Sequence, residues 1–220
     1  MDTSVWRPCA GRCARRGRAG NLVQSPGPAS GLLAFDAAAP EGERYEYWDG
    51  EVVPVHGYDE SGTAAMAGAS PEHNQITLNL SALLHGPMTR RGCRGGVGDQ
   101  RVRTEEGRYG YPDLVFACDE PDYTDDSPPV LLNPTLLVEV ASPSTAGRDR
   151  GRTLTAYTRI ESLAEYWMVE PDRPEVTCVV RSADGWALRF ALGADAVVEG
   201  AALGLAVPLA DVYRLVDVGA

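Results

Sequence analysis

The stretch PTLLVEVAS, residues 134–142, places Glu139 in the middle of an otherwise apolar run. Side chains two apart in a strand share a face, so Leu137 accompanies Glu139 while Val138 takes the other face. Apolar residues on both faces indicate a strand in the middle of a sheet. A carboxylate buried alone is costly or has its pKa raised, so we expect Glu139 to have a partner. That partner is either a bound cation or an arginine in a structural ion pair, with Arg148, Arg150 and Arg152 as candidates.

The segments on either side predict a hairpin and two helices. Asp49-Gly50 between two strand-like runs is typical of a hairpin turn. Ser70 followed by Pro71 predicts the start of a helix, which Gly86-Pro87 should end or kink. A second helix begins near Asp149, where this residue is a candidate N-cap, and turns Tyr157 into the core.

The order of elements is a strand hairpin, a helix, strands, a helix and more strands. It predicts an α/β (α+β) fold in which a mixed central sheet is flanked by helices. Residues 1–30 are rich in Arg, Gly and Pro and show no periodicity, so we expect a disordered tail there. Residues 31–220 form the expected single domain.

The composition limits the function. The formal net charge of −11 disfavours non-specific binding to nucleic acid, because phosphates dominate such affinity. All 20 basic residues are arginine, so any chemistry that needs lysine lacks it here. The five cysteines are scattered and contain no CxxC pair, and no run is apolar enough to span a membrane. We therefore expect a cytoplasmic protein with reduced cysteines.

A second acid stands at the head of the apolar strand in YPDLVFACD, residues 111–119. Asp113 follows Pro112, which cannot donate to a strand ladder, so this end of the strand is an edge or a bulge. Two acids on neighbouring strands, Asp113 and Glu139, can bind one hard cation through oxygen. Such a cation lowers the pKa of a bound water and neutralises charge on a phosphodiester.

Several segments together resemble a known family. YPDLVF, LLNPTLLVEVASPST and DRGRTLTAYTRIESLAEYWMVEP, preceded by RYEYWDGEVV and SPEHNQIT, are similar to the Uma-two-type branch of the PD-(D/E)xK restriction-endonuclease-like superfamily. The resemblance spans roughly residues 43–190 and depends on the ordered set of segments.

The resemblance implies a metal-dependent endonuclease that hydrolyses DNA, with Mg²⁺ or Mn²⁺ held by Asp113 and Glu139. It implies an auxiliary acid at Glu46, with Glu51 as the alternative. His73 matches the SPxH segment and is expected to contact substrate or to satisfy a backbone group. We expect Arg101 to contact phosphate or to lie on a solvated face with Arg103.

This sequence differs from the family in lacking its lysine. The parent motif has it two residues after the glutamate, which is Ala141 here, and the resembling branch has it on the next helix, at Thr153. Arg152 beside that slot can supply charge but not a neutral base. Either Arg152 substitutes in catalysis, or the protein is a degenerate nuclease that binds nucleic acid or a protein. A third alternative is a structural interaction protein, and a homodimer would suit an enzyme that cuts two strands.

Overall fold

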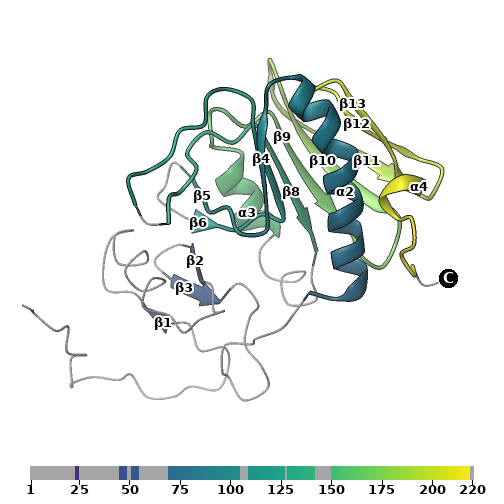
Figure 1. The fold of residues 1–220 in the computed structure, drawn as a ribbon, viewed down its shortest axis with the longest axis horizontal. Coiled ribbons are helices and arrows are strands. Elements are labelled where there is room, and N and C mark those ends of the chain that lie inside the picture. The colour runs from purple at the N-terminus through teal and green to yellow at the C-terminus, as the bar shows by residue number, and fades with distance from the viewer. Residues whose placement is uncertain are drawn as a thin grey trace, which may run out of the picture.

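The computed structural model describes residues 23–24, 45–48, 51–54, 69–104, 109–126, 128–141 and 150–218. Its centre is a six-stranded sheet in the order β11-β10-β9-β8-β7-β4 (Figure 1). Neighbouring strands are antiparallel except β8 and β9, which are parallel, so the predicted mixed sheet is confirmed. The strands are β4 Arg94–Val97, β7 Leu114–Ala117, β8 Leu136–Val140, β9 Glu165–Val169, β10 Glu175–Ser182 and β11 Gly185–Leu192.

Each face of this sheet packs against a different helix. Helix α2 (Pro71–Arg90) lies on one face, where Val138 of β8 joins its core, and α3 (Arg150–Tyr157) lies on the other with Leu137 (Figure 1). Helix α3 connects β8 to β9, which is the crossover that a parallel pair requires. The predicted alternation along residues 134–142 is therefore confirmed, and β8 is a central strand.

Helix α2 begins where the sequence predicts. The Ser70 side chain caps it by accepting a hydrogen bond of 3.2 Å from the His73 amide, with Pro71 at the first helical position. The helix does not end at Pro87 but continues to Arg90, so of the two predicted outcomes, a stop or a kink, the stop is wrong. Met88, in the turn that contains Pro87, is fully buried in the core. This burial offsets the hydrogen bond that the proline cannot donate.

Two smaller sheets complete the described structure. One has the order β1-β3-β2-β6-β5 and contains the predicted hairpin, in which Trp48 pairs with Glu51. Its first strand lies within the stretch expected to be a tail, and the remainder of residues 1–30 lies outside the described residues. The second pairs β12 with β13 and leads into a short helix. These elements are β1 Val23–Gln24, β2 Tyr45–Trp48, β3 Glu51–Pro54, β5 Val102–Arg103, β6 Tyr109–Gly110, β12 Val197–Gly200, β13 Leu205–Pro208 and α4 Leu209–Val212.

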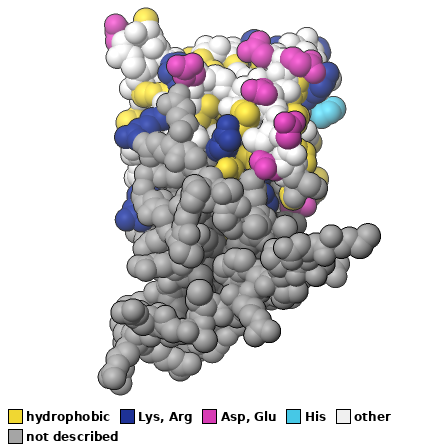
Figure 2. Space-filling view, turned by 90° about the vertical axis from the view of Figure 1, so that its left-hand side faces the viewer, with side chains coloured by type: hydrophobic (Ala, Val, Ile, Leu, Met, Phe, Trp, Pro, Cys, Tyr) yellow, Lys and Arg dark blue, Asp and Glu magenta, His cyan; other side chains and the backbone are white. Residues whose placement is uncertain are grey.

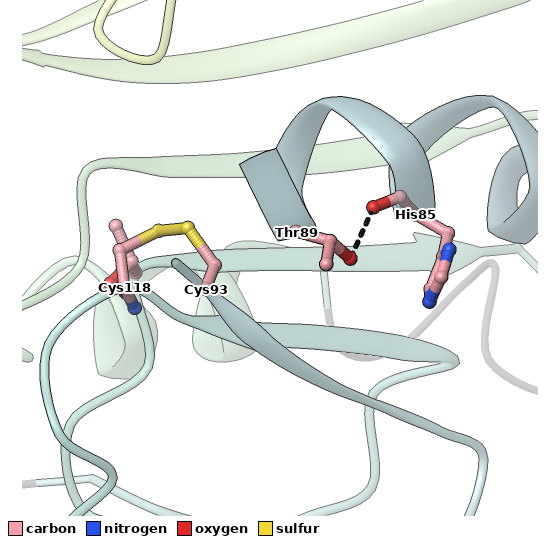
Figure 3. The surroundings of a disulfide bond; sticks show 5 residues. His85, Thr89, Cys93 and Cys118 are labelled. Atoms are coloured by element: carbon pink, nitrogen blue, oxygen red, sulfur yellow. Dashed lines mark hydrogen bonds between the residues drawn. A yellow bond between two sulfur atoms is a disulfide. The ribbon is translucent and has the colours of Figure 1, made fainter. Parts of the chain in front are cut away.

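The cysteines correct another expectation. Cys93 and Cys118 are joined by a disulfide bond beside the C-terminal turn of α2, near the Thr89–His85 hydrogen bond (Figure 3). Arg94 of β4 pairs with Ala117 of β7, so the two cysteines stand opposite each other one position further along. Their 25-residue separation in the sequence gives no sign of this pairing. Within the described residues, no helix is both long and apolar enough to cross a membrane.

Candidate functional site

Asp113 lies at the end of the β7–β8 ladder. Its Oδ2 accepts a hydrogen bond of 2.7 Å from the Val140 amide. The next amide, Ala141, donates to Val169 on the far side of β8. Because successive amides of a strand point to opposite sides, the Val140 amide faces β7, where the ladder stops at Pro112. The Asp113 carboxylate thus takes the place of a strand partner at this position.

The pairing register brings Glu139 to the same end of the two strands. The last recorded pair of β7 and β8 is Leu114 with Val138, so Asp113 and Glu139 are the next opposed positions. The Asp113 carboxylate binds the backbone of the residue that follows Glu139. Two acids that lie 26 positions apart in the sequence are therefore brought to adjoining strand ends.

One contact of Glu139 is with Tyr166 of β9. The Tyr166 hydroxyl donates a hydrogen bond of 2.5 Å to Glu139 Oε2. The Tyr166 ring packs edge-on against the ring of Tyr157 in α3, with 5.2 Å between the ring centroids. Tyr166 is nearly fully buried, so its hydroxyl needs a partner, and the carboxylate supplies one. Sequence analysis missed this residue. The available signal was the alternation of side chains along β9. Tyr166 pairs with Leu137, and both side chains lie on the same face of the sheet as Glu139.

His73 contacts the other acid from the first turn of α2. Its Nε2 lies 3.2 Å from Asp113 Oδ1, so each oxygen of this carboxylate has a partner. Burial lowers the pKa of His73, but the hydrogen bond and charge of Asp113, with the Val140 carbonyl, outweigh burial and raise the pKa above its usual range. The ring Nδ1 is buried and has no well-formed hydrogen bond. The SPxH segment therefore places an imidazole at the candidate site.

Helix α3 carries Thr153, where the resemblance implies a lysine, on its inner side. Thr153 is 7% exposed and lies on the same side of the helix as Tyr157, one turn further on. A side chain at Thr153 therefore points toward the sheet face that carries Tyr166 and Glu139. Arg152 is exposed on the adjacent side of the helix. Asp149, the expected cap, lies outside the described residues.

Of two other predicted site residues, the structure describes the side chain of Arg101 but not that of Glu46. Arg101 is only 2% exposed, so it is not on a solvated face; its Nε and Nη2 lie 2.8 and 2.6 Å from the Tyr111 hydroxyl. The guanidinium carbon also lies over the same ring, 5.3 Å from its centre. These contacts of Arg101 are therefore with a residue of its own chain. Glu46 belongs to β2, opposite Val53, but its side chain lies outside the described part of the structure, as does that of Glu51.

A further buried carboxylate has a structural role. Glu165 is fully buried and accepts hydrogen bonds from the Trp167 indole at 2.8 Å and the Leu203 amide at 2.9 Å. Burial raises the pKa of Glu165. It ties β9 to the turn between β12 and β13, so we do not place it in the candidate site.

Comparison with known proteins identifies the family. The model of the Uma2 family, described as "Putative restriction endonuclease", matches residues 32–210. The chain belongs to the Uma2 family. The resemblance found in the sequence is thereby confirmed.

Curated relatives and a solved structure agree with this membership. Uncharacterized protein sll1609 of Synechocystis sp. is 33% identical over 71% of this chain and 84% of its own length. Uncharacterized protein slr1290 of the same organism is 28% identical over 83% of this chain and 98% of its own length. A crystal structure from Anabaena variabilis, described as a "putative nuclease belonging to DUF820", has a TM-score of 0.63 at 14% identity. It covers 83% of this chain and 97% of its own, and shows that the fold is shared.

The donors of this Uma2 protein are of the kind that a hard divalent cation prefers. Asp113 and Glu139 occupy opposed positions at one end of the β7–β8 ladder, and Mg²⁺ is usually bound by one or two carboxylates with water completing its shell. Among the described residues, no three His, Cys, Asp or Glu side chains form a group that could hold an ion. By residue type, Asp113 and Glu139 are thus donors that such a cation accepts.

Surface charge does not single out a nucleic-acid surface on the face shown in Figure 2. Acidic and basic side chains are interspersed over its described part. With a net charge of −11, generic attraction to DNA is weak for this Uma2 protein.

Proposed function

We propose that this protein is a metal-dependent endonuclease that hydrolyses phosphodiester bonds in DNA. The observation that carries the proposal is the hydrogen bond from the Val140 amide to Asp113, which fixes this carboxylate beside the strand position of Glu139. Membership of a family described as "Putative restriction endonuclease" supports the reaction class. Metal dependence and the DNA substrate are the steps that we add.

Asp113 and Glu139 would hold Mg²⁺ or Mn²⁺, with the Val140 carbonyl as a further ligand and Glu46 as an auxiliary acid. Bound there, such a cation supplies charge neutralisation on the phosphodiester and a lowered pKa for the attacking water. The protein's own contribution would be to orient each of the two carboxylates before metal arrives. The Val140 amide does this for Asp113, and the Tyr166 hydroxyl does it for Glu139.

Positive charge at the site would come from His73 and Arg152. The raised pKa of His73 favours its imidazolium form beside Asp113, so this residue would both orient the carboxylate and attract a phosphate oxygen. Arg152 would stabilise developing negative charge at the start of α3. Arg152 does not replace a lysine that deprotonates, because arginine stays protonated.

The test is cleavage of supercoiled plasmid and of single-stranded DNA with Mg²⁺ or Mn²⁺. Asp113→Asn and Glu139→Gln preserve shape and remove charge, and each should lower the rate by at least about 100-fold. Asp119→Asn is the matched control, because Asp119 is an exposed acid beyond the other end of β7. Equal rates in the two site variants and the control would remove these acids from the mechanism.

A second function is favoured by one observation. The lysine position is occupied by the buried Thr153, and the chain has no lysine elsewhere to replace it. The protein would then be a nuclease-fold module that binds nucleic acid or a protein without cutting. Binding of DNA in the presence of metal, with no cleavage of either substrate, would favour this alternative.

A further inference from the structure

Strand β11 carries an unusual stripe of exposed apolar side chains. Leu188, Phe190 and Leu192 are 56%, 63% and 62% exposed, and they alternate along one face of the strand. Their face is that of α3, because Val179, opposite Leu188, belongs to the core beneath this helix. The eight-residue helix α3 leaves this part of the face uncovered. Isolated exposed apolar residues are ordinary, whereas a contiguous stripe marks an interaction surface.

The same strand is an edge of the main sheet. Among the described strands β11 pairs with β10 alone and lies at the opposite edge from β4 (Figure 1). The Gly193 amide donates to Pro174 on the β10 side, and successive amides of a strand point to opposite sides. The amides of Leu188, Phe190 and Leu192 therefore point to the open edge. Unpaired backbone groups and apolar side chains coincide on one strand, which favours addition of another strand.

We propose that β11 pairs with β11 of a second copy of this chain, with Phe190 on the two-fold axis. Two copies of one edge strand related by such an axis are antiparallel, and the surface is self-complementary. The six-stranded sheet becomes continuous across the dimer, and the two stripes merge into one apolar surface. A dimer of this kind does not depend on nuclease activity.

Side-chain type selects the register. Centring on Phe190 places Leu188 opposite Leu192 of the second copy and the two Phe190 rings opposite each other. Centring on Arg189, which lies beside Glu199 of its own chain, would place Leu192 opposite Trp186 of the second copy. Centring on Leu188 would place Leu192 opposite the turn residue Asp184 of the second copy. Only the Phe190 register pairs all three exposed residues with one another.

Sedimentation velocity over about 1–100 μM protein tests the dimer, since a modest apolar stripe predicts a concentration-dependent equilibrium. Phe190→Glu places two carboxylates at the axis and should raise the dimer dissociation constant by at least about 100-fold. Leu78→Glu is the matched control, because Leu78 is also 63% exposed but lies on α2. Circular dichroism melts show whether both variants fold. A wild type that stays monomeric throughout, or equal effects of the two variants, would overturn the proposal.

Cross-linking tests the register. Under mild oxidation Phe190→Cys should form a disulfide with residue 190 of the second copy, mapped by mass spectrometry against the wild-type cysteines. Leu188→Cys should not link to itself, because in this register residue 188 faces residue 192. A 188–188 link, or a dimer without the 190–190 link, would overturn the register.

Discussion

His73 Nε2 lies 3.2 Å from Asp113 Oδ1, while the Val140 amide binds the other oxygen of the same carboxylate at 2.7 Å. Asp113 is therefore held between a helix and a strand that are distant in the sequence. Its position is set before any substrate arrives. The consequences of this arrangement can be measured separately.

The His73–Asp113 contact predicts a pH-dependent term in stability. The folded state raises the pKa of His73, so it binds the proton more tightly than the unfolded chain does. The stabilisation is complete below the ordinary histidine pKa and is lost as pH rises through the raised value. Urea unfolding without metal should show a smaller change between about pH 6 and pH 8.5 in His73→Gln than in wild type. His85→Gln, an exposed histidine of the same helix, is the control, and an unchanged pH dependence in His73→Gln would refute the contact.

Tyr166→Phe tests the hydrogen bond to Glu139. Loss of a donor to a partly buried carboxylate should lower the free energy of unfolding by about 1–2 kcal/mol. It should also weaken Mn²⁺ binding by about 10-fold, because the hydroxyl orients the ligand. Tyr157→Phe removes the other hydroxyl of the ring pair and is the matched control in calorimetric titrations. Equal metal affinity in Tyr166→Phe and wild type would show that this bond has no role in orienting Glu139.

Thr153→Lys tests the missing lysine. The position faces the sheet near Tyr157, so a lysine there should raise metal-dependent DNA cleavage by at least about 10-fold. Arg152→Lys adds a lysine at the exposed neighbouring position and should change the rate little. A folded Thr153→Lys protein that cuts no faster than wild type would place the family's lysine position elsewhere.

The Cys93–Cys118 bond predicts a sizeable loss of stability on reduction. Closing a 25-residue separation constrains the unfolded chain by about 3.5 kcal/mol. The double variant Cys93→Ala/Cys118→Ala should lose this amount in urea unfolding, and dithiothreitol should lower the stability of wild type only. If the oxidised wild type is no more stable than the double variant, the bond contributes nothing to the fold.

The sequence was informative where a pattern is local. Ser70-Pro71 predicts the helix start, Asp49-Gly50 predicts the hairpin, and the alternation around Glu139 predicts a central strand. All three depend on capping, turn geometry and side-chain period, which a short segment contains in itself.

The remainder depends on register and long-range packing. The Cys93–Cys118 bond and the Glu139–Tyr166 contact arise from strand pairing, and no spacing in the sequence reports which residues stand opposite each other. Helix α2 continues past Pro87 because Met88 is buried by elements distant in the sequence, so tertiary packing prevails over the local signal.

Titration of the metal-free protein with Mn²⁺, followed by calorimetry and by electron paramagnetic resonance of the free ion, tests the central claim most directly. We predict one site per chain in the wild type and in Asp119→Asn, weakened by at least about 10-fold in both Asp113→Asn and Glu139→Gln. Absence of binding at millimolar Mn²⁺, or the same affinity in all four proteins, would contradict a shared cation site at these two acids.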